Sequence, residues 1–125
     1  MNFTLETGDG LSLIQQYGAG FVRIEAREYR SSIVVAPGIA IAEWPPQSLD
    51  DLLESHLEIL IARNPEVVVL GTGRRQRFPA TNLTARILQV RIGLEVMDTA
   101  SACRTYNVLA AEGRNVCAAL MMIEE

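Results

Sequence analysis

The strongest constraint on the fold is an uninterrupted apolar run, Val67-Val68-Val69-Leu70, which stops at Gly71-Thr72-Gly73. Four aliphatic residues without polar alternation predict a strand that is covered on both faces, as in a parallel sheet flanked by helices. Asn64-Pro65 precedes the run and the glycines follow it, so residues that interrupt regular structure bound it on both sides. We therefore expect this strand to lie at the centre of the fold.

The residues before this strand carry the pattern of a helix. Between Leu49 and Ile61, leucines and isoleucines recur at spacings of three and four residues, which places them on one helical face. Ser48 is expected to begin the helix by accepting a hydrogen bond from the Asp51 amide. Asp50 and Asp51 would then place negative charge at the positive end of the helix dipole.

After the central strand, helical and extended patterns alternate. The expected elements are a helix from Thr81 or Asn82 to Ile92, a strand at 94–97, a helix capped by Asp98 or Thr99 and ended by Gly113, and a strand at 116–123. Gly93 is expected to end the first of these helices in the left-handed conformation. Alternating strands and helices predict right-handed crossovers and a largely parallel core sheet.

The first part of the chain favours antiparallel strands, because short alternating or β-branched runs are separated by turn residues. The expected strands are a short edge strand at 3–5, a hairpin of 21–26 and 29–36 with its corner at Arg27-Glu28, and a strand at 39–44 bounded by Pro37-Gly38 and Pro45-Pro46.

Length and composition indicate an ordinary globular protein. A chain of 125 residues, 49% of them hydrophobic, is expected to form one domain, with an antiparallel half at about 1–46 and a βαβαβ-like half at about 47–125. The net charge of −4 and the single basic cluster, Arg74, Arg75 and Arg77, disfavour nucleic acid as a partner. The first ten residues lack the pattern of a targeting signal, and no apolar run reaches the roughly 20 residues of a membrane span. We therefore expect a cytoplasmic protein without membrane insertion.

Several motifs around the last helix resemble one family of small uncharacterised domains. They are the segments 93–99, 102–109, 112–114 and 118–120, together with Gly71-Thr72-Gly73 and the valines before it. The family includes a mitochondrial assembly factor of respiratory complex I, complex I assembly factor 3, and an adipogenesis-associated protein. The resemblance implies a mixed α/β (α+β) fold of three layers: a central mixed sheet, helices on one side, and a β-hairpin layer plus a helix on the other. It implies no known reaction.

A candidate binding site follows from the expected sheet. If the strands that end at Leu70 and Met97 are parallel neighbours, their carboxyl ends meet at one edge, where ligands of open α/β sheets bind. The residues expected at that edge are Gly71, Thr72, Gly73, Arg74, Asp98, Thr99 and Arg104. We expect a small anion or an acidic partner group to bind there.

Simpler interpretations of these residues remain open. The glycines match no nucleotide-binding motif, since Gln76 stands where a third glycine is required and the chain has no Gly-Lys pair. They can instead form a tight turn after a buried strand. The arginines can be a solvated loop, and Asp98 and Thr99 can act only as a helix cap.

Catalysis has little support in the residues. His56 is the single histidine and lies among leucines, while Cys103 and Cys117 lie in core elements and are expected to be reduced. One histidine and two distant cysteines cannot form a metal site, so we expect neither metal nor cofactor.

The favoured function is a protein-binding or assembly-type module without catalytic activity, with self-association also open. The Trp44-Pro45-Pro46 corner is a candidate contact surface, although tryptophan more commonly closes a core. The alternative is a small-anion or nucleotide-like ligand, or less readily an enzyme, at the crevice between Gly71-Thr72-Gly73 and the helix start at Asp98-Thr99.

Overall fold

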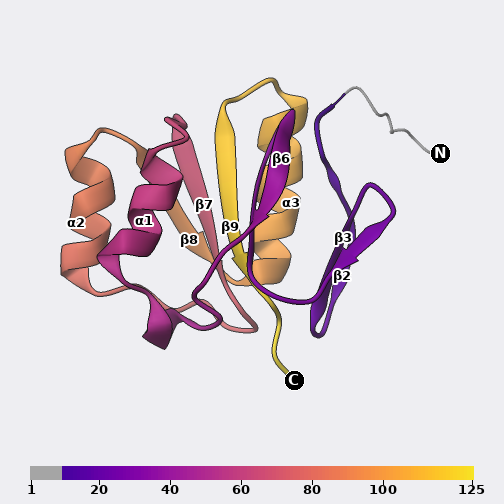
Figure 1. Cartoon of the computed structure of the whole chain (residues 1–125), viewed down its shortest axis with the longest axis horizontal. Coiled ribbons are helices and arrows are strands. Elements are labelled where there is room, and N and C mark those ends of the chain that lie inside the picture. Colours follow the sequence, from indigo (N-terminus) through magenta and orange to yellow (C-terminus); the bar gives the residue numbers. More distant parts are fainter. Residues whose placement is uncertain (1–9) are drawn as a thin grey trace.

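The computed structural model describes residues 10–125 and arranges them in three layers (Figure 1). The strands are β2 (Ile14–Gly18), β3 (Phe21–Ile24), β4 (Arg27–Tyr29), β5 (Ile33–Ala36), β6 (Ile39–Glu43), β7 (Val67–Thr72), β8 (Gly93–Met97) and β9 (Val116–Met121). The helices are the 3-10 helix η1 (Leu49–Asp51) and the α-helices α1 (Glu54–Ile61), α2 (Thr81–Gln89) and α3 (Thr99–Ala111).

The middle layer is a mixed sheet of five strands in the order β6-β5-β9-β7-β8. β7 pairs in parallel with both β8 and β9, whereas β5 pairs antiparallel with β9 and β6. Every residue of β7 is buried. The expected parallel core and the central place of this strand are therefore confirmed.

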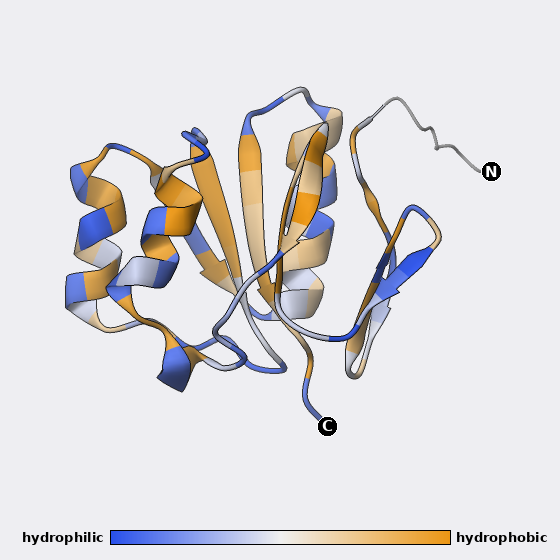
Figure 2. Cartoon of the chain, viewed as in Figure 1, coloured by the Kyte–Doolittle hydropathy of each residue, from blue (hydrophilic) through white to orange (hydrophobic). Residues whose placement is uncertain are grey.

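The two faces of the sheet bury different cores. Val67 and Val69 of β7 pack with α3 and the sheet β2-β3-β4, while Val68 and Leu70 pack with α1 and α2. Helices thus cover one face, and a helix with a β-hairpin layer covers the other, which confirms the three-layer expectation. Figure 2 shows the central strands as almost wholly hydrophobic and β4 as hydrophilic.

The expected hairpin in the first half is partly wrong. Its corner lies at Glu25 and Ala26, which take φ values of 54° and 66°, and not at Arg27-Glu28. Two residues with positive φ form the turn that matches the twist of a two-residue hairpin. The run from 29 to 36 is divided between β4 and β5, which belong to different sheets, and β2 was not expected. The strand expected at 3–5 lies outside the described residues.

The helix expected from Ser48 is also wrong in its start. η1 ends at Asp51, and α1 begins only at Glu54. The Ser48 side chain caps no backbone amide; instead Nδ1 of His56 accepts a hydrogen bond of 3.0 Å from the Leu53 amide.

The expected end of α3 is confirmed, whereas the expected end of α2 and the exposed position considered for Trp44 are wrong. Arg91, with φ 62°, takes the left-handed conformation after α2, while Gly93 begins β8. Gly113, with φ 81°, follows α3 as expected. Trp44 is buried and donates from Nε1 to the His56 carbonyl at 3.2 Å, so it closes the core beside α1 and is not an exposed contact.

Gly71 allows α3 to lie close against β7. A Cβ at this position would lie 2.9 Å from Thr99 Oγ1 and 3.1 Å from both Ala102 Cβ and Leu120 Cδ2. Since contacts this short force the helix or the sheet to move, any side chain at Gly71 overpacks the core.

We predict that Gly71→Ala lowers the free energy of unfolding by about 2 kcal/mol, the usual cost of overpacking a core. Gly93→Ala is the matched control, because its Cβ would approach nothing closer than 3.4 Å. It should change the stability by less than about 0.5 kcal/mol, as most surface substitutions do. Urea unfolding followed by circular dichroism measures both, and equal losses for the two variants would contradict the packing role of Gly71.

Candidate functional site

The carboxyl ends of β7, β8 and β9 meet at one edge of the central sheet. β7 and β8 are in register from Val67↔Gly93 to Gly71↔Met97, so the turn after β7 lies beside the start of α3. The Thr99 amide donates to the Gly73 carbonyl at 2.8 Å. The expected adjacency of Gly71-Thr72-Gly73 and Asp98-Thr99 is therefore present.

The Thr99 hydroxyl joins the three strand ends. It is fully buried, accepts from the Gly73 amide at 2.8 Å and donates to the Met121 carbonyl at 2.7 Å. Through these two bonds it links the end of β7, the end of β9 and the first turn of α3. Because an unpaired buried amide is costly, this hydroxyl stabilises the junction of the three elements.

Thr72 shapes the loop that follows β7. Its hydroxyl donates to the Arg75 carbonyl at 2.6 Å and accepts from the Arg77 amide at 3.1 Å. Gln76 Nε2 donates to the Val96 carbonyl at 2.8 Å, and Arg77 pairs with Asp50 at 2.7 Å. The loop is thus fixed at several points, while the side chains of Arg74 and Arg75 are exposed.

Asp98 is the N-cap of α3. Its carboxylate accepts from the Ser101 amide and from the Ser101 hydroxyl, both at 2.9 Å. The bond from the Ser101 amide lowers the pKa of Asp98 below its usual value, and nearby Arg104 acts in the same direction. Asp98 is therefore an ionised helix cap at neutral pH.

Arg104 lies one turn further along α3 and faces the hairpin layer. It donates to the Tyr17 hydroxyl at 2.6 Å and to the Ser101 hydroxyl at 3.3 Å. It therefore connects the α3 cap to β2 and does not point at the Gly73 turn. Of the seven expected site residues, Arg104 is the one that the geometry places apart.

Sequence reasoning missed Glu124 at this edge. The Arg74 amide donates to Glu124 Oε1 at 3.0 Å, so the segment after β9 reaches the turn after β7. No local pattern relates Arg74 and Glu124, which lie 50 positions apart in the sequence. Only the parallel pairing of β9 with β7 brings them together.

The expected anion donors are already used within the protein. The Gly73 amide is bonded to Thr99, the Arg74 amide to Glu124, and the Thr72 hydroxyl to the loop. A phosphate at this turn would have to displace one of these groups. The arrangement is that of a locked turn rather than an open phosphate-binding loop.

Both cysteines are buried and reduced. Burial raises the pKa of the Cys103 thiol to about 12 and that of Cys117 to about 11, so both stay protonated at neutral pH. Within residues 10–125, no group of three or more His, Cys, Asp and Glu side chains is arranged to hold a metal ion.

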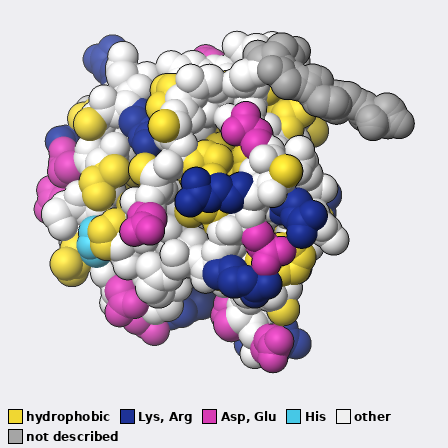
Figure 3. Space-filling view, turned by 45° about the vertical axis from the view of Figure 1, so that its right-hand side comes forward, with side chains coloured by type: hydrophobic (Ala, Val, Ile, Leu, Met, Phe, Trp, Pro, Cys, Tyr) yellow, Lys and Arg dark blue, Asp and Glu magenta, His cyan; other side chains and the backbone are white. Residues whose placement is uncertain are grey.

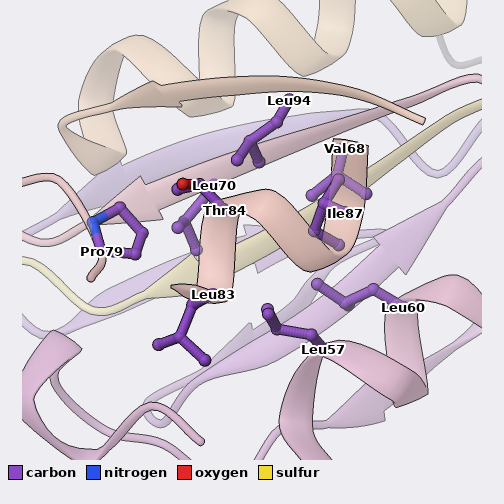
Figure 4. A pocket seen from close by; sticks show the side chains of 9 residues that line it. All are labelled: Leu57, Leu60, Val68, Leu70, Pro79, Leu83, Thr84, Ile87 and Leu94. Carbon is purple, nitrogen blue, oxygen red and sulfur yellow. The ribbon is translucent and has the colours of Figure 1, made fainter. Parts of the chain in front are cut away.

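An apolar pocket lies between the helical layer and the sheet (Figure 4). It is lined by Leu57, Leu60, Val68, Leu70, Pro79, Leu83, Thr84, Ile87 and Leu94. Its cavity volume is about 10 Å³, enough for roughly one water molecule and far below that of a small-molecule site. We therefore treat it as a gap in the core packing.

The hairpin layer presents charges of both signs. Figure 3 shows arginine and acidic side chains interspersed on this side of the molecule. Glu28 pairs with both Arg23 and Arg30, and the hydrogen bond from Arg23 lowers the pKa of Glu28. This face therefore lacks the single-sign field that binds a polyanion.

Comparisons with known proteins agree on the kind of domain. Residues 14–121 match the family model described as a protein of unknown function, DUF498/DUF598. The chain is 28% identical over 104 residues to a Francisella tularensis protein named "13 kDa major membrane protein", covering 82% of this chain and 84% of that one. A Bordetella pertussis protein, described as a Mth938-like domain and solved in solution, matches with a TM-score of 0.85 at 30% identity, over 100% of this chain and 94% of that one.

One relative is larger than this chain. The bovine NADH dehydrogenase (ubiquinone) 1 alpha subcomplex assembly factor 3 is 34% identical over 84 residues. The match covers 66% of this chain and 46% of the bovine protein, so the chain spans about half the length of this relative. Among residues 10–125, no helix is both long and apolar enough to cross a membrane.

We predict that Thr99→Val lowers the free energy of unfolding by about 2 kcal/mol, because it leaves the Gly73 amide buried without its partner and removes the hydroxyl bond to the Met121 carbonyl. Thr99→Ser keeps the hydroxyl and should cost less than about 1 kcal/mol, the value of one buried methyl group. Urea unfolding of both variants tests this, and a Val variant as stable as the Ser variant would show that the hydroxyl is not needed.

Proposed function

The chain belongs to the DUF498/DUF598 family, and on this premise we propose that it is a protein-binding module of the assembly type without catalytic activity of its own. Its contact surface in this proposal is the 74–78 loop, which runs from Arg74 to Phe78 between β7 and α2. We propose the cytoplasm as its location and one domain as its organisation.

The observation that carries the proposal is that this loop is exposed and yet held in place. The Phe78 side chain is 71% exposed, the largest exposure among the exposed large hydrophobic residues of the described chain. Arg74 and Arg75 are exposed in the same loop, and the loop backbone is fixed by the Thr72 hydroxyl. At this exposure the ring contributes little to the packing of residues 10–125.

Arginine and aromatic residues are the types that contribute most to protein interfaces. A loop that is already ordered also avoids part of the entropy cost of binding. With two exposed arginines and Phe78 in one loop, the complementary surface is acidic and includes an apolar contact. These features favour a protein partner over a small ligand.

The relatives give further support of a weaker kind. The bovine relative is named an assembly factor, and assembly factors act through contacts with other proteins. This chain matches only part of that protein, so the partner is not transferred with the name. The Francisella relative is named a membrane protein, and a domain that reaches a membrane through a partner is compatible with that name.

A small-anion or nucleotide-like ligand at the Gly73 turn is the second candidate. The geometry favours it less, since the Gly73 amide and the Thr99 hydroxyl are bonded to each other. An enzyme at this crevice would have no activated thiol among the described residues, because Cys103 and Cys117 are buried with raised pKa values.

We predict that Arg75→Glu combined with Phe78→Ser lowers recovery of a specific partner at least about tenfold, since hot-spot residues each contribute more than 1 kcal/mol. The measurement is quantitative affinity purification of the tagged protein from its source cell. The control combines Arg91→Glu with Leu88→Ser, two residues that are also exposed but lie outside the loop.

The wild-type and control proteins should recover the same partner. Equal recovery by the loop variant would contradict the proposed surface. Native mass spectrometry of the same samples separates the other outcomes, because a bound small molecule without a protein partner would favour the ligand alternative, and a second copy of the chain would identify self-association.

A further inference from the structure

We propose that the Gly73-Arg74 turn is a carboxylate-binding site, which the chain fills with its own Glu124 and which takes an acidic side chain of a protein partner in its place. The identity of that ligand as a partner's side chain rests on the proposed function above. The site itself does not.

The Glu124 carboxylate is seated on the turn. Its Oε1 accepts the Arg74 amide at 3.0 Å. It also lies directly over Gly73, where an added Cβ would be 2.5 Å from Oε1 and 3.3 Å from both Cδ and Oε2. The bare α-carbon of Gly73 therefore forms the floor of the site, and any other residue there would exclude the carboxylate.

The floor of the site is independent of its occupant. Gly73 has φ 97°, and both its amide and its carbonyl are bonded to Thr99 of α3. These bonds do not involve Glu124. The turn thus keeps its shape when the carboxylate leaves, and the released donor is the Arg74 amide.

The occupant, in contrast, can be exchanged at low cost. Glu124 is exposed, and the segment before it is anchored independently, because the Gly20 amide donates to the Ile123 carbonyl at 2.8 Å. Rotation of one exposed side chain is sufficient to vacate the site. Arg74 and Arg75 would draw an incoming carboxylate to it through their positive charge, whereas Arg77 is paired with Asp50.

An internal carboxylate competes with an added one. A tethered group acts at an effective concentration in the millimolar range or above, so it weakens binding of a free carboxylate without changing the site. Removing Glu124 should therefore strengthen binding of acetate, the simplest carboxylate.

The experiment is an amide chemical-shift titration of the ¹⁵N-labelled full chain with sodium acetate up to about 0.1 M, against sodium chloride of equal ionic strength. In Glu124→Ala, the Arg74 amide should shift saturably, with an apparent acetate Kd at least about tenfold lower than in the wild type. Glu125→Ala removes the neighbouring carboxylate and should behave as the wild type. The site is overturned if Glu124→Ala shows no saturable shift, if it matches the wild type, or if chloride has the same effect.

The acetate titration and the partner-capture experiment can fail independently of each other. Acetate binding to Glu124→Ala without any protein partner at the 74–78 loop would support the site and refute its use in protein binding. A partner captured through the loop, with no acetate response, would support the proposed function and refute the carboxylate site.

Discussion

The hydroxyl of Thr99 is the contact on which the arrangement of this edge depends. It bonds the Gly73 amide and the Met121 carbonyl in the interior, and it can do so only because Gly71 has no side chain to hold α3 away from β7. The ends of β7 and β9 and the start of α3 are therefore held together by one hydroxyl group. A side chain of similar shape without the hydroxyl would leave the buried Gly73 amide unpaired and would remove the bond to the Met121 carbonyl.

These internal hydrogen bonds explain why this edge of the sheet does not resemble an open ligand site. In open α/β sheets the crevice at the strand ends commonly presents free amides. Here the amides of Gly73 and Arg74 are both bonded within the chain, and Thr72 holds the loop backbone. What the edge presents to its surroundings is a set of exposed arginines and Phe78 on a fixed loop. The chemistry that remains available is recognition by charge and by one apolar side chain.

Local patterns in the sequence predicted the parts of the fold that local forces determine. The buried run ending at Leu70, the cap at Asp98 and the left-handed Gly113 follow from burial, capping and glycine conformation. Local patterns did not predict the break before α1, because Leu52 and Leu53 both suit a continuous helix. Tertiary packing determines the break: Leu52 is buried in the core, whereas Leu53 is exposed.

The other features that the sequence did not predict depend on the pairing of strands. The corner at Glu25-Ala26 carries no turn residue, and the pairing of β3 with β4 imposes its positive φ values. The contact between Arg74 and Glu124 exists because β9 inserts between β5 and β7, a strand order that no local pattern determines. The meeting of Gly73 with Asp98-Thr99 was predictable because it requires only that two consecutive strands lie side by side.

Native-state hydrogen exchange at the Gly73 amide tests the locked edge most directly. If the Thr99 hydroxyl holds this amide in the interior, it should exchange as slowly as the Leu70 amide of β7, because both are released only by global unfolding. Exchange of Gly73 near the rate of the exposed loop amide of Arg75, while Leu70 stays protected, would show that the edge opens locally and would contradict the role assigned to Thr99.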